Sequence, residues 1–417
     1  MSARTLLATV AVCAIATAAQ AIEPVGSDSF NVDTPFDLSG LTAENFYDVV
    51  VPAAQVEGSV TFFDFTNSFG PLFSERLIPA FEEEYGISVE YVRGNGDAAA
   101  QQLMAAMNAG ADAPADLYFI GSSMQRTLEE AGAMANLPLY QVLPSAATVD
   151  ENLATMTEGH HHGGIYLPFH RNQTSIVYNT RFIDEGTAPT NFEDLLAWAQ
   201  ANEGRFVLTS PSGGGSGGGF LQSVMLDMVE GDECRAALSN YSISQEDAEA
   251  YAASDCLQPV WDYYNALLPV VELSTGNSDT LTLVANGAGY LGTAWEDMAY
   301  DFMGRGLLPP TTRQYLLEEG QVGGGDGLFL PADGTAPAAA LLMMDFLMSE
   351  DIQLEKLQVN GSRTARTDID PTAVFSPEEA ARLIPTAQFA ERARVTIPRP
   401  LYNATRDYFD ATVLAGN

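Results

Sequence analysis

The segment from Val60 to Val92 constrains the fold most, because it reads as a strand, a helix and a second strand in succession. The β-rich run TFFDF leads through the turn TNSFGP into an amphipathic helix that ends at Gly86, and the strand SVEYV follows. The inward face of the helix is expected to carry Leu72, Leu77, Ile78 and Phe81. Two strands joined by a helix pair in parallel, so the sequence predicts an α/β fold.

Strands and helices continue to alternate along the chain, which is too long for a single core: 417 residues with 46% hydrophobic content. We therefore expect two lobes, each a mixed sheet flanked by helices, joined by strand crossovers. The first crossover, GGIYLPFHRNQTSIVYN, reads as two apolar strands interrupted by a polar turn. The predicted division is an export signal at 1–21, an N-terminal extension at 22–56, lobe one at 57–167 and 328–370, lobe two at 178–321 and 376–417, and hinge crossings at 168–177 and 322–327.

The N-terminus has the pattern of a cleavable export signal. Arg4 precedes a mostly apolar run from Leu6 to Ala19, and Ala19-Gln20-Ala21 supplies small residues for cleavage. The run is shorter than the roughly 20 residues that span a bilayer, which disfavours an uncleaved anchor. We expect a mature periplasmic protein that starts near Ile22, with a peripheral arm before Glu57.

Acidic residues dominate the chain, with 55 Asp and Glu against 18 Lys and Arg and a net charge of −37. This charge excludes nucleic acid as a partner. The acids are scattered, which favours a surface adapted to a saline medium over a localised acidic site.

Two cysteines remain once the export signal is removed. Cys234 and Cys256 are separated by 22 residues, and in an oxidising periplasm we expect them to form one structural disulfide. We expect a monomer.

Four segments together resemble a known family: IPAFEEEYGISVE after the first strand, YLPFHRNQTSIVYN, YLGTAWEDMA and LFLPADGTAPAAALLMMDFLMSEDIQ. They are similar, in the same order, to the extracellular solute-binding proteins of ABC importers, in the type II group with polyamine-, iron- and thiamine-binding members. The resemblance implies a type II periplasmic binding fold. It also implies a non-catalytic receptor that closes over a small polar solute, delivers it to a membrane permease and needs no cofactor.

Ligands of open α/β sheets bind at the carboxyl ends of strands, near helix N-termini. The side chains and amides expected there are Asn67, Ser68, Ser122, Ser123, Asn172, Gln173, Ser212, Gly213, Ser216, Trp295, Glu296 and Asp326. Asn67 or Ser68 could equally cap a helix, and Trp295 could belong to the core.

The nature of the solute stays open between two chemistries. Trp295, Glu296 and Asp326 favour an amine, and the resemblance implies that Asp326 matches an acid of the polyamine-binding relatives. The glycine-rich loop Ser212–Gly219 favours a carboxylate, phosphate or polyol instead. A zwitterion satisfies both.

Two other functions remain as alternatives. Gly214–Gly218 fits the hydrolase pattern G-x-S-x-G with Ser216 as nucleophile, although no histidine follows His170. The run His160–His162 could hold a metal ion, although three consecutive residues cannot all converge on one ion. Arg171 would bind an anion if it faced inward, but we expect it at the surface.

Overall fold

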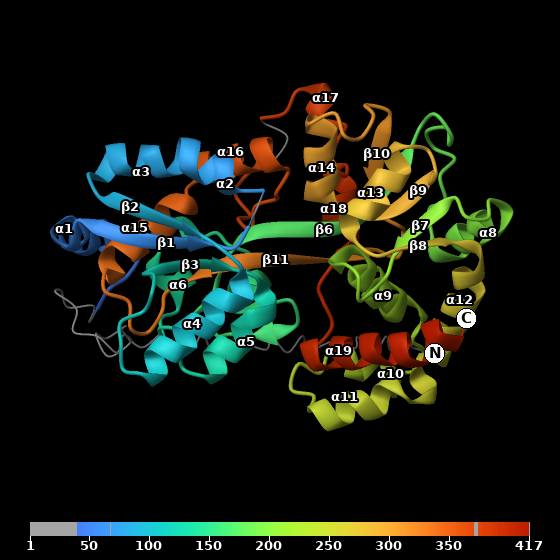
Figure 1. Ribbon diagram of the computed structural model, residues 1–417, viewed down its shortest axis with the longest axis horizontal. Coiled ribbons are helices and arrows are strands. Elements are labelled where there is room, and N and C mark those ends of the chain that lie inside the picture. The colour runs from blue at the N-terminus through green and yellow to red at the C-terminus, as the bar shows by residue number, and fades with distance from the viewer. Residues whose placement is uncertain (1–39, 67, 371–373, 417) are drawn as a thin grey trace, which may run out of the picture.

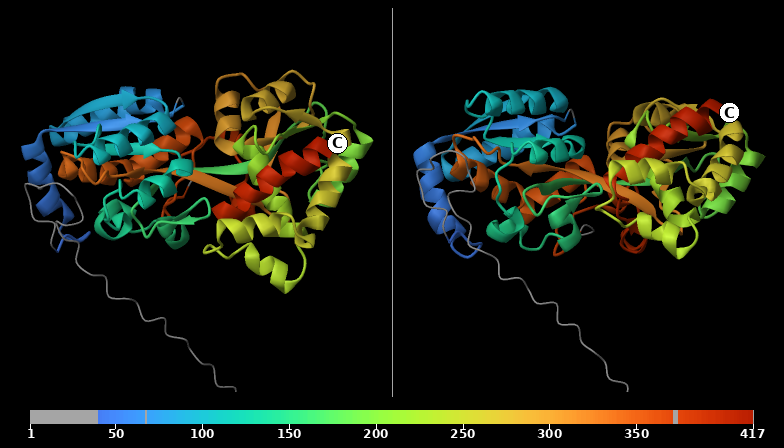
Figure 2. Two further views of the ribbon diagram at one scale, coloured as in Figure 1. Left: turned by 60° about the horizontal axis from the view of Figure 1, so that its bottom comes forward. Right: turned by 90° about the horizontal axis from the view of Figure 1, so that it is seen from below.

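The computed structural model describes residues 40–66, 68–370 and 374–416. The predicted export signal at 1–21 and the candidate Asn67 lie outside these ranges. Two lobes lie side by side, and two long strands run from one into the other (Figures 1 and 2). Helices flank the sheet in both lobes, which confirms the predicted two-lobed α/β fold.

One ten-stranded sheet runs through both lobes in the order β2-β1-β3-β11-β6-β9-β7-β8, with β10 paired to β6 and β12 to β11. Its strands are β1 Ser59–Asp64, β2 Ser88–Arg93, β3 Leu117–Ile120, β6 Leu167–Asn179, β7 Phe206–Thr209, β8 Glu272–Ser274, β9 Leu291–Trp295, β10 Thr312–Tyr315, β11 Gln321–Phe329 and β12 Ala393–Arg394. β1 pairs in parallel with β2 and β3, whereas β6 and β11 pair antiparallel at the centre. The parallel ladders follow from the helical crossovers expected between their strands.

Lobe one is built on the predicted strand–helix–strand unit. Its helices are α1 Phe46–Glu57, α2 Gly70–Leu72, α3 Ile78–Tyr85, α4 Gly96–Asn108, α5 Ser122–Glu130, α6 Leu139–Val142, α7 Glu151–Thr155, α15 Pro337–Leu347 and α16 Glu350–Asn360. The four apolar residues expected on the inward face of the first amphipathic helix are all buried, which confirms that face. Gly86 ends α3 with φ 70°, a left-handed conformation that glycine adopts without strain.

The interpretation of the residues before Glu57 as a peripheral arm is wrong for α1. Phe46, Val50 and Ala54 are fully buried in the lobe-one core, and α1 packs along α15. The four-residue spacing puts them on one helix face, so α1 buries an apolar stripe like any other core helix.

Lobe two holds the second large core. Its helices are α8 Phe192–Ala201, α9 Gly215–Met228, α10 Asp232–Ala237, α11 Gln245–Ala252, α12 Gln258–Leu267, α13 Asn277–Ala285, α14 Glu296–Gly304, α17 Pro377–Ala380, α18 Thr386–Arg392 and α19 Arg399–Tyr408. Cys234 of α10 and Cys256, just after α11, form the expected disulfide. It ties α10 to the short turn that follows α11, and α19 packs on α11 (Figure 1).

The first crossing differs from the expected pair of strands with a turn, because β6 is one continuous strand of 13 residues. Residues 171–173 pair with Gly323–Gly325 of β11. The buried Gln173 amide donates to the carbonyl oxygen of Gln321, at 2.7 Å. A buried polar side chain that forms its hydrogen bond with the neighbouring strand can stay within a continuous strand, so the polar residues here do not mark a turn.

A short hairpin, β4 Met156–Thr157 and β5 His160–His161, lies beside the crossing strands. A third passage follows α16, where Arg363 forms an isolated β-bridge with Arg171. Within the described ranges, two strands of the shared sheet join the lobes, and the stretch after α16 pairs with the first of them through Arg363.

Candidate functional site

The lobe-one wall of the space between the lobes is formed where β1 and β3 end. Loops after these strands and at the start of α4 border an open hollow of about 410 Å³. Its lining residues are Phe65, Gly94, Asn95, Gly96, Asp97, Ile120, Gly121, Ser123 and Met124. Polar backbone groups at the start of α5 are thus close to a solvent-filled hollow at the carboxyl edge of the sheet.

The predicted serines have different positions on this wall. Ser122 is buried at the first position of α5, and Ser123 lines the hollow. Ser68 is exposed, and its carbonyl oxygen accepts a hydrogen bond from the Asn360 amide at 3.1 Å. Of Ser68, Ser122 and Ser123, Ser123 is the residue that lines the lobe-one hollow.

The lobe-two wall centres on Trp295, which ends β9. A hollow of about 110 Å³ lies between the lobes here, and it is lined by Glu158, Gly215, Gly219, Gln222, Trp295, Val322, Gly323, Thr396, Ile397, Arg399 and Tyr402. A Cβ atom on Gly215 would come within 2.7 Å of the Trp295 indole, so glycine lets α9 begin directly against the ring. Trp295 is half-buried and presents part of its ring to this hollow.

Asp326 is a half-buried carboxylate on β11, one of the two strands that cross between the lobes, and its Oδ1 lies beside Gly121, which lines the lobe-one hollow. It accepts a hydrogen bond from the backbone N–H of Ser122 at 3.1 Å, and it has no ion-pair partner within the described ranges. Burial, and then the charge of Glu158, raise its pKa to about 7. A carboxylate enclosed by protein without a compensating charge is costly, and a bound cation would lower that cost.

Asp297 is a second perturbed carboxylate, at the start of α14. Its Oδ2 lies 3.6 Å from Nε2 of His170, and its buried Oδ1 has no hydrogen-bond partner in the described part of the chain. Burial raises the pKa of Asp297 to about 7, and the charge of Asp297 in turn raises the pKa of Asp326. Burial lowers the pKa of His170 to about 3, so this imidazole is neutral and compensates neither acid.

Glu296 was expected to face the solute, but its carboxylate is already occupied. Arg363 donates two hydrogen bonds to it, at 2.7 and 2.8 Å, and Ile384 donates a backbone N–H at 2.7 Å. All three residues are buried. This bidentate pair fixes the third passage against α14 and leaves Glu296 a structural role.

The two crossing amides have separate roles. Gln173 binds β6 to β11, as described above. Asn172 has a buried Oδ1 with no partner among the described residues, and it lies under Gly324 near Glu158. Asn172 is therefore the crossing amide with hydrogen-bonding capacity to spare.

The glycine-rich loop packs closely against its neighbours, although Ser212, Gly213 and Gly215 remain exposed. The Ser212 hydroxyl donates to Asp410, and Gly213 lies against the backbone of Thr275. The Ser216 hydroxyl is buried, donates to Asn277 Oδ1 at 2.7 Å and lies 3.0 Å from the Thr209 hydroxyl. No described histidine contacts it, so this arrangement does not favour Ser216 as a nucleophile.

The three consecutive histidines are spread over three contacts. His160 pairs with Glu129 at 2.5 Å, the His161 ring meets Tyr241 edge-on with centroids 5.2 Å apart, and His162 is buried against Thr157. The described residues contain no group of three or more His, Cys, Asp or Glu side chains placed to hold a metal ion. The metal-carrier alternative is not favoured.

The hairpin that carries these histidines also touches lobe two. Glu158 forms an ion pair with Arg399, and the carbonyl oxygen of Gly159 accepts the Arg399 backbone N–H at 3.1 Å. The same Glu158 accepts a hydrogen bond from Gly325 of β11 at 3.4 Å. Glu158 and Arg399 do not belong to the predicted set, because only the folded chain brings them together and no local pattern marks either residue.

No helix in the described ranges is both long enough and apolar enough to cross a membrane. The chain folds into two lobes that share strands, and the ends of these strands border a polar space. This arrangement is that of a two-lobed solute-binding protein. The chain belongs to the bacterial extracellular solute-binding proteins, whose family model matches residues 76–382. The resemblance seen in the sequence is thereby confirmed.

Individual relatives are distant. The chain is 26% identical over 256 residues to protein YnjB of Escherichia coli K12, an alignment that spans 58% of this chain and 61% of YnjB, less than two thirds of that relative. The fold is similar to that of an extracellular solute-binding protein from Bordetella parapertussis, with a TM-score of 0.66 and 15% identity over 85% of this chain and 99% of that one.

Two further solved structures share the fold. The spermidine/putrescine substrate-binding protein PotD of Streptococcus pneumoniae has a TM-score of 0.60 and 14% identity, covering 85% of this chain and 98% of PotD. Iron-bound HitA of Pseudomonas aeruginosa has a TM-score of 0.56 and 19% identity, covering 84% and 99%. At these identities the likeness concerns the fold alone.

Proposed function

We propose that this protein is the periplasmic substrate-binding component of an ABC importer and that its solute is a small organic molecule with a protonated amine. The observation that carries the proposal is Asp326, a half-buried carboxylate without a cationic partner in the described ranges, set between the two lobes. A protonated amine would supply the missing charge.

The surroundings of Asp326 fit an amine on an organic body. Asp297 adds a second carboxyl group whose Oδ1 lacks a hydrogen-bond partner among the described residues, and Trp295 offers a half-buried aromatic ring in the same interlobe space. Aromatic faces attract ammonium groups. Ser123 and Asn172 supply neutral polar groups that could select among amines by their remaining substituents.

Closure over the solute is supported by the way the lobes are joined. Binding between two lobes stabilises the closed arrangement by the difference in affinity for the closed and open forms. A permease in the inner membrane would recognise that closed form. We also propose export by the N-terminal signal, action as a monomer, and binding without catalysis.

The experiment is a calorimetric titration with amines of increasing size, guided by a thermal-shift screen over amines, amino acids, sugars and phosphates. Wild-type protein is expected to bind an amine that Asp326→Asn binds at least about tenfold more weakly, since one charge-assisted hydrogen bond is worth about 1.5–3 kcal/mol. Asp112→Asn, at an exposed lobe-one position, is the matched control. Binding of neutral sugars with equal affinity in wild type and Asp326→Asn would contradict the proposal.

A further inference from the structure

Arg171 lies on β6 where the strand crosses between the lobes, and its guanidinium lacks a polar partner among the described residues. It forms no hydrogen bond and no ion pair with any described side chain or carbonyl group, and its one ring contact is Phe389, 4.9 Å from the ring centroid. It is half-buried, and burial lowers its pKa. Arg363, on the neighbouring passage, is in contrast fully paired with Glu296.

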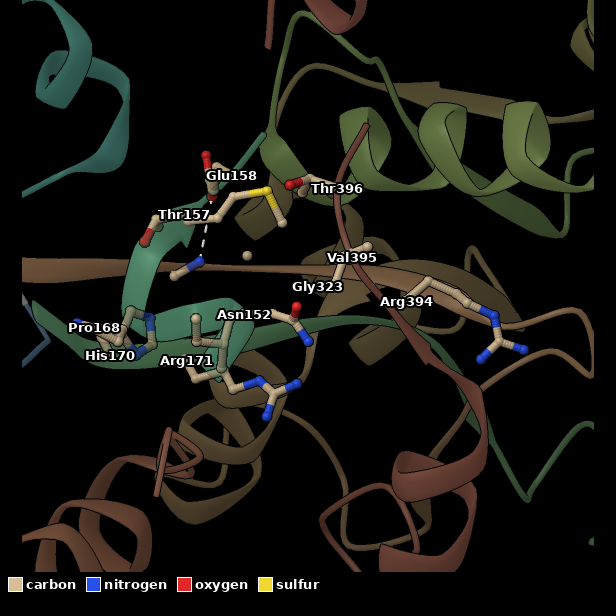
Figure 3. Close-up of a pocket in the computed structure, with 14 residues that line it drawn as sticks. Asn152, Thr157, Glu158, Pro168, His170, Arg171, Gly323, Arg394, Val395 and Thr396 are labelled. Carbon is tan, nitrogen blue, oxygen red and sulfur yellow. Dashed lines mark hydrogen bonds between the residues drawn. The ribbon is translucent and has the colours of Figure 1, made fainter. Parts of the chain in front are cut away.

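A small hollow of about 40 Å³ lies at Arg171. Its lining includes Asn152, Glu158, Arg171, Arg394 and Thr396, together with the three glycines Gly323–Gly325 of β11. Figure 3 shows the strand residues on one side and the segment Arg394–Thr396 on the other. The three glycines of β11 lie opposite residues 171–173 and bring no side chains into this space.

Two neutral groups in the lining also have spare hydrogen-bonding capacity. Neither the side-chain amide of Asn152 nor the side-chain hydroxyl of Thr396 forms a hydrogen bond with any described residue. The acids nearby are already engaged: Glu158 pairs with Arg399, and Asp150 caps α7 through the N–H groups of Asn152 and Leu153. A guanidinium, an amide and a hydroxyl are the groups that bind oxyanions.

We propose that this hollow is an anion site, distinct from the amine site at Asp326, and that it takes a carboxylate or phosphate group. The anion is either a free ion or the acidic end of the transported solute. Asn152 comes from lobe one, Arg171 from the crossing and Thr396 from lobe two, so the occupant touches all three parts. An anion bound in this way stabilises one relative position of the lobes.

The test measures the melting temperature of wild type, Arg171→Gln and Arg181→Gln in inorganic phosphate and in acetate, against sodium chloride of equal ionic strength. Arg181 is exposed on lobe two, so its replacement removes the same charge away from the hollow. Wild type and Arg181→Gln are expected to show a rise that grows with the logarithm of anion concentration, and Arg171→Gln is expected to lose it. General salt effects on stability act on all three proteins alike.

A second arm identifies the source of the anion by comparing 4-aminobutyrate with butylamine, which lacks the carboxylate. If the solute brings the anion, 4-aminobutyrate binds wild type more tightly than butylamine does, and Arg171→Gln removes the difference.

Should Arg171→Gln fail to fold, Asn152→Ala and Thr396→Val replace it, because neither residue is in a core. The proposal is overturned if anions raise the melting temperature of wild type and of the variants equally. It is also overturned if wild type neither responds to phosphate or acetate nor prefers 4-aminobutyrate over butylamine. Loss of amine binding in Asp326→Asn with an intact anion response separates this site from the proposed function.

Discussion

Glu158, on the lobe-one hairpin, forms an ion pair with Arg399 at the first position of α19 in lobe two. The residues are 241 positions apart in the chain, and the pair closes one side of the space between the lobes. The hairpin itself is tied to lobe one through His160 and Glu129. The relative position of the lobes thus depends on a contact that no crossing strand provides.

Replacing Arg399 with Gln is expected to weaken solute binding, because it removes a contact that holds the lobes together. Both side chains are about one-fifth exposed, so the pair is worth about 1 kcal/mol, or about a fivefold change in affinity. Calorimetry on Glu158→Gln, Arg399→Gln and the double variant gives the coupling between them. Arg406→Gln, which breaks a pair with the neighbouring Asp407 on the same helix, is the control. Strictly additive effects would show that the pair does not act in closure.

Stability without solute is expected to fall as pH rises from about 4 to about 7. The pKa of Asp326 is raised from 3.8 to about 7, so in this window the unfolded chain releases a proton that the folded protein retains. The contribution of Asp326 to this loss is at most about 4 kcal/mol, because each tenfold difference in proton affinity between the folded and unfolded states corresponds to about 1.4 kcal/mol. Urea unfolding at several pH values measures it.

Asp326→Asn is expected to flatten this pH dependence. Asp297, also with a pKa of about 7, keeps part of it, so Asp297→Asn provides the complementary measurement. An unchanged pH profile in both variants would mean that neither acid is protonated at neutral pH.

Amine binding by wild type should strengthen between pH 6 and 8, because the cation binds the ionised carboxylate.

Trp295 is expected to report solute binding by fluorescence, because its ring faces the interlobe hollow. Trp295→Ala should weaken amine binding about tenfold through loss of the ring contact. Trp198→Phe, on α8 of lobe two, should leave both affinity and the fluorescence change intact. A fluorescence response that survives in Trp295→Ala would place the solute elsewhere.

Lys356 is the sole lysine of the chain, and it is fully buried. Its ammonium group donates to the carbonyl oxygen of Phe169 and to Gln353 at 2.9 Å, and burial lowers its pKa. An amine-reactive ester should therefore leave Lys356 unmodified in the folded protein and modify it after denaturation in urea. Peptide mass mapping distinguishes the two states, and rapid native labelling would contradict the buried position.

Loss of the Cys234–Cys256 disulfide is expected to cost about 3 kcal/mol of stability, from the entropy of a loop closed over 22 residues. Cys234→Ser/Cys256→Ser and wild type under reducing conditions should show the same decrease on urea unfolding. Solute affinity should not change, because the disulfide lies away from the interlobe hollows. An equal stability of the oxidised and reduced protein would show that α10 and α11 are held by packing alone.

Local patterns predicted the parts of the fold that depend on neighbouring residues. The turn after β1 and the stop at Gly86 are set within a few residues, so the strand–helix–strand unit was visible. α1 also has a helical pattern, but the surface it covers belongs to α15, almost three hundred residues later. Sequence alone could not separate a core helix from a peripheral one there.

Polar residues were harder to interpret because their partners are distant. Asn172 and Gln173 suggested a turn, whereas in the sheet Gln173 bonds to Gln321 on the opposite strand. Glu296 beside Trp295 suggested a ligand contact, and its actual partner is Arg363. Asp326 was predicted through the resemblance, and no local signal connects it with Glu158.

The position of α1 at the outer end of lobe one has a practical consequence. α1 and α8 belong to different lobes and lie at opposite ends of the long axis of the molecule (Figure 1). Dyes attached to an exposed position of each helix would form an energy-transfer pair. Their separation would follow the angle between the lobes molecule by molecule, so cargo uptake could be timed without labelling the cargo.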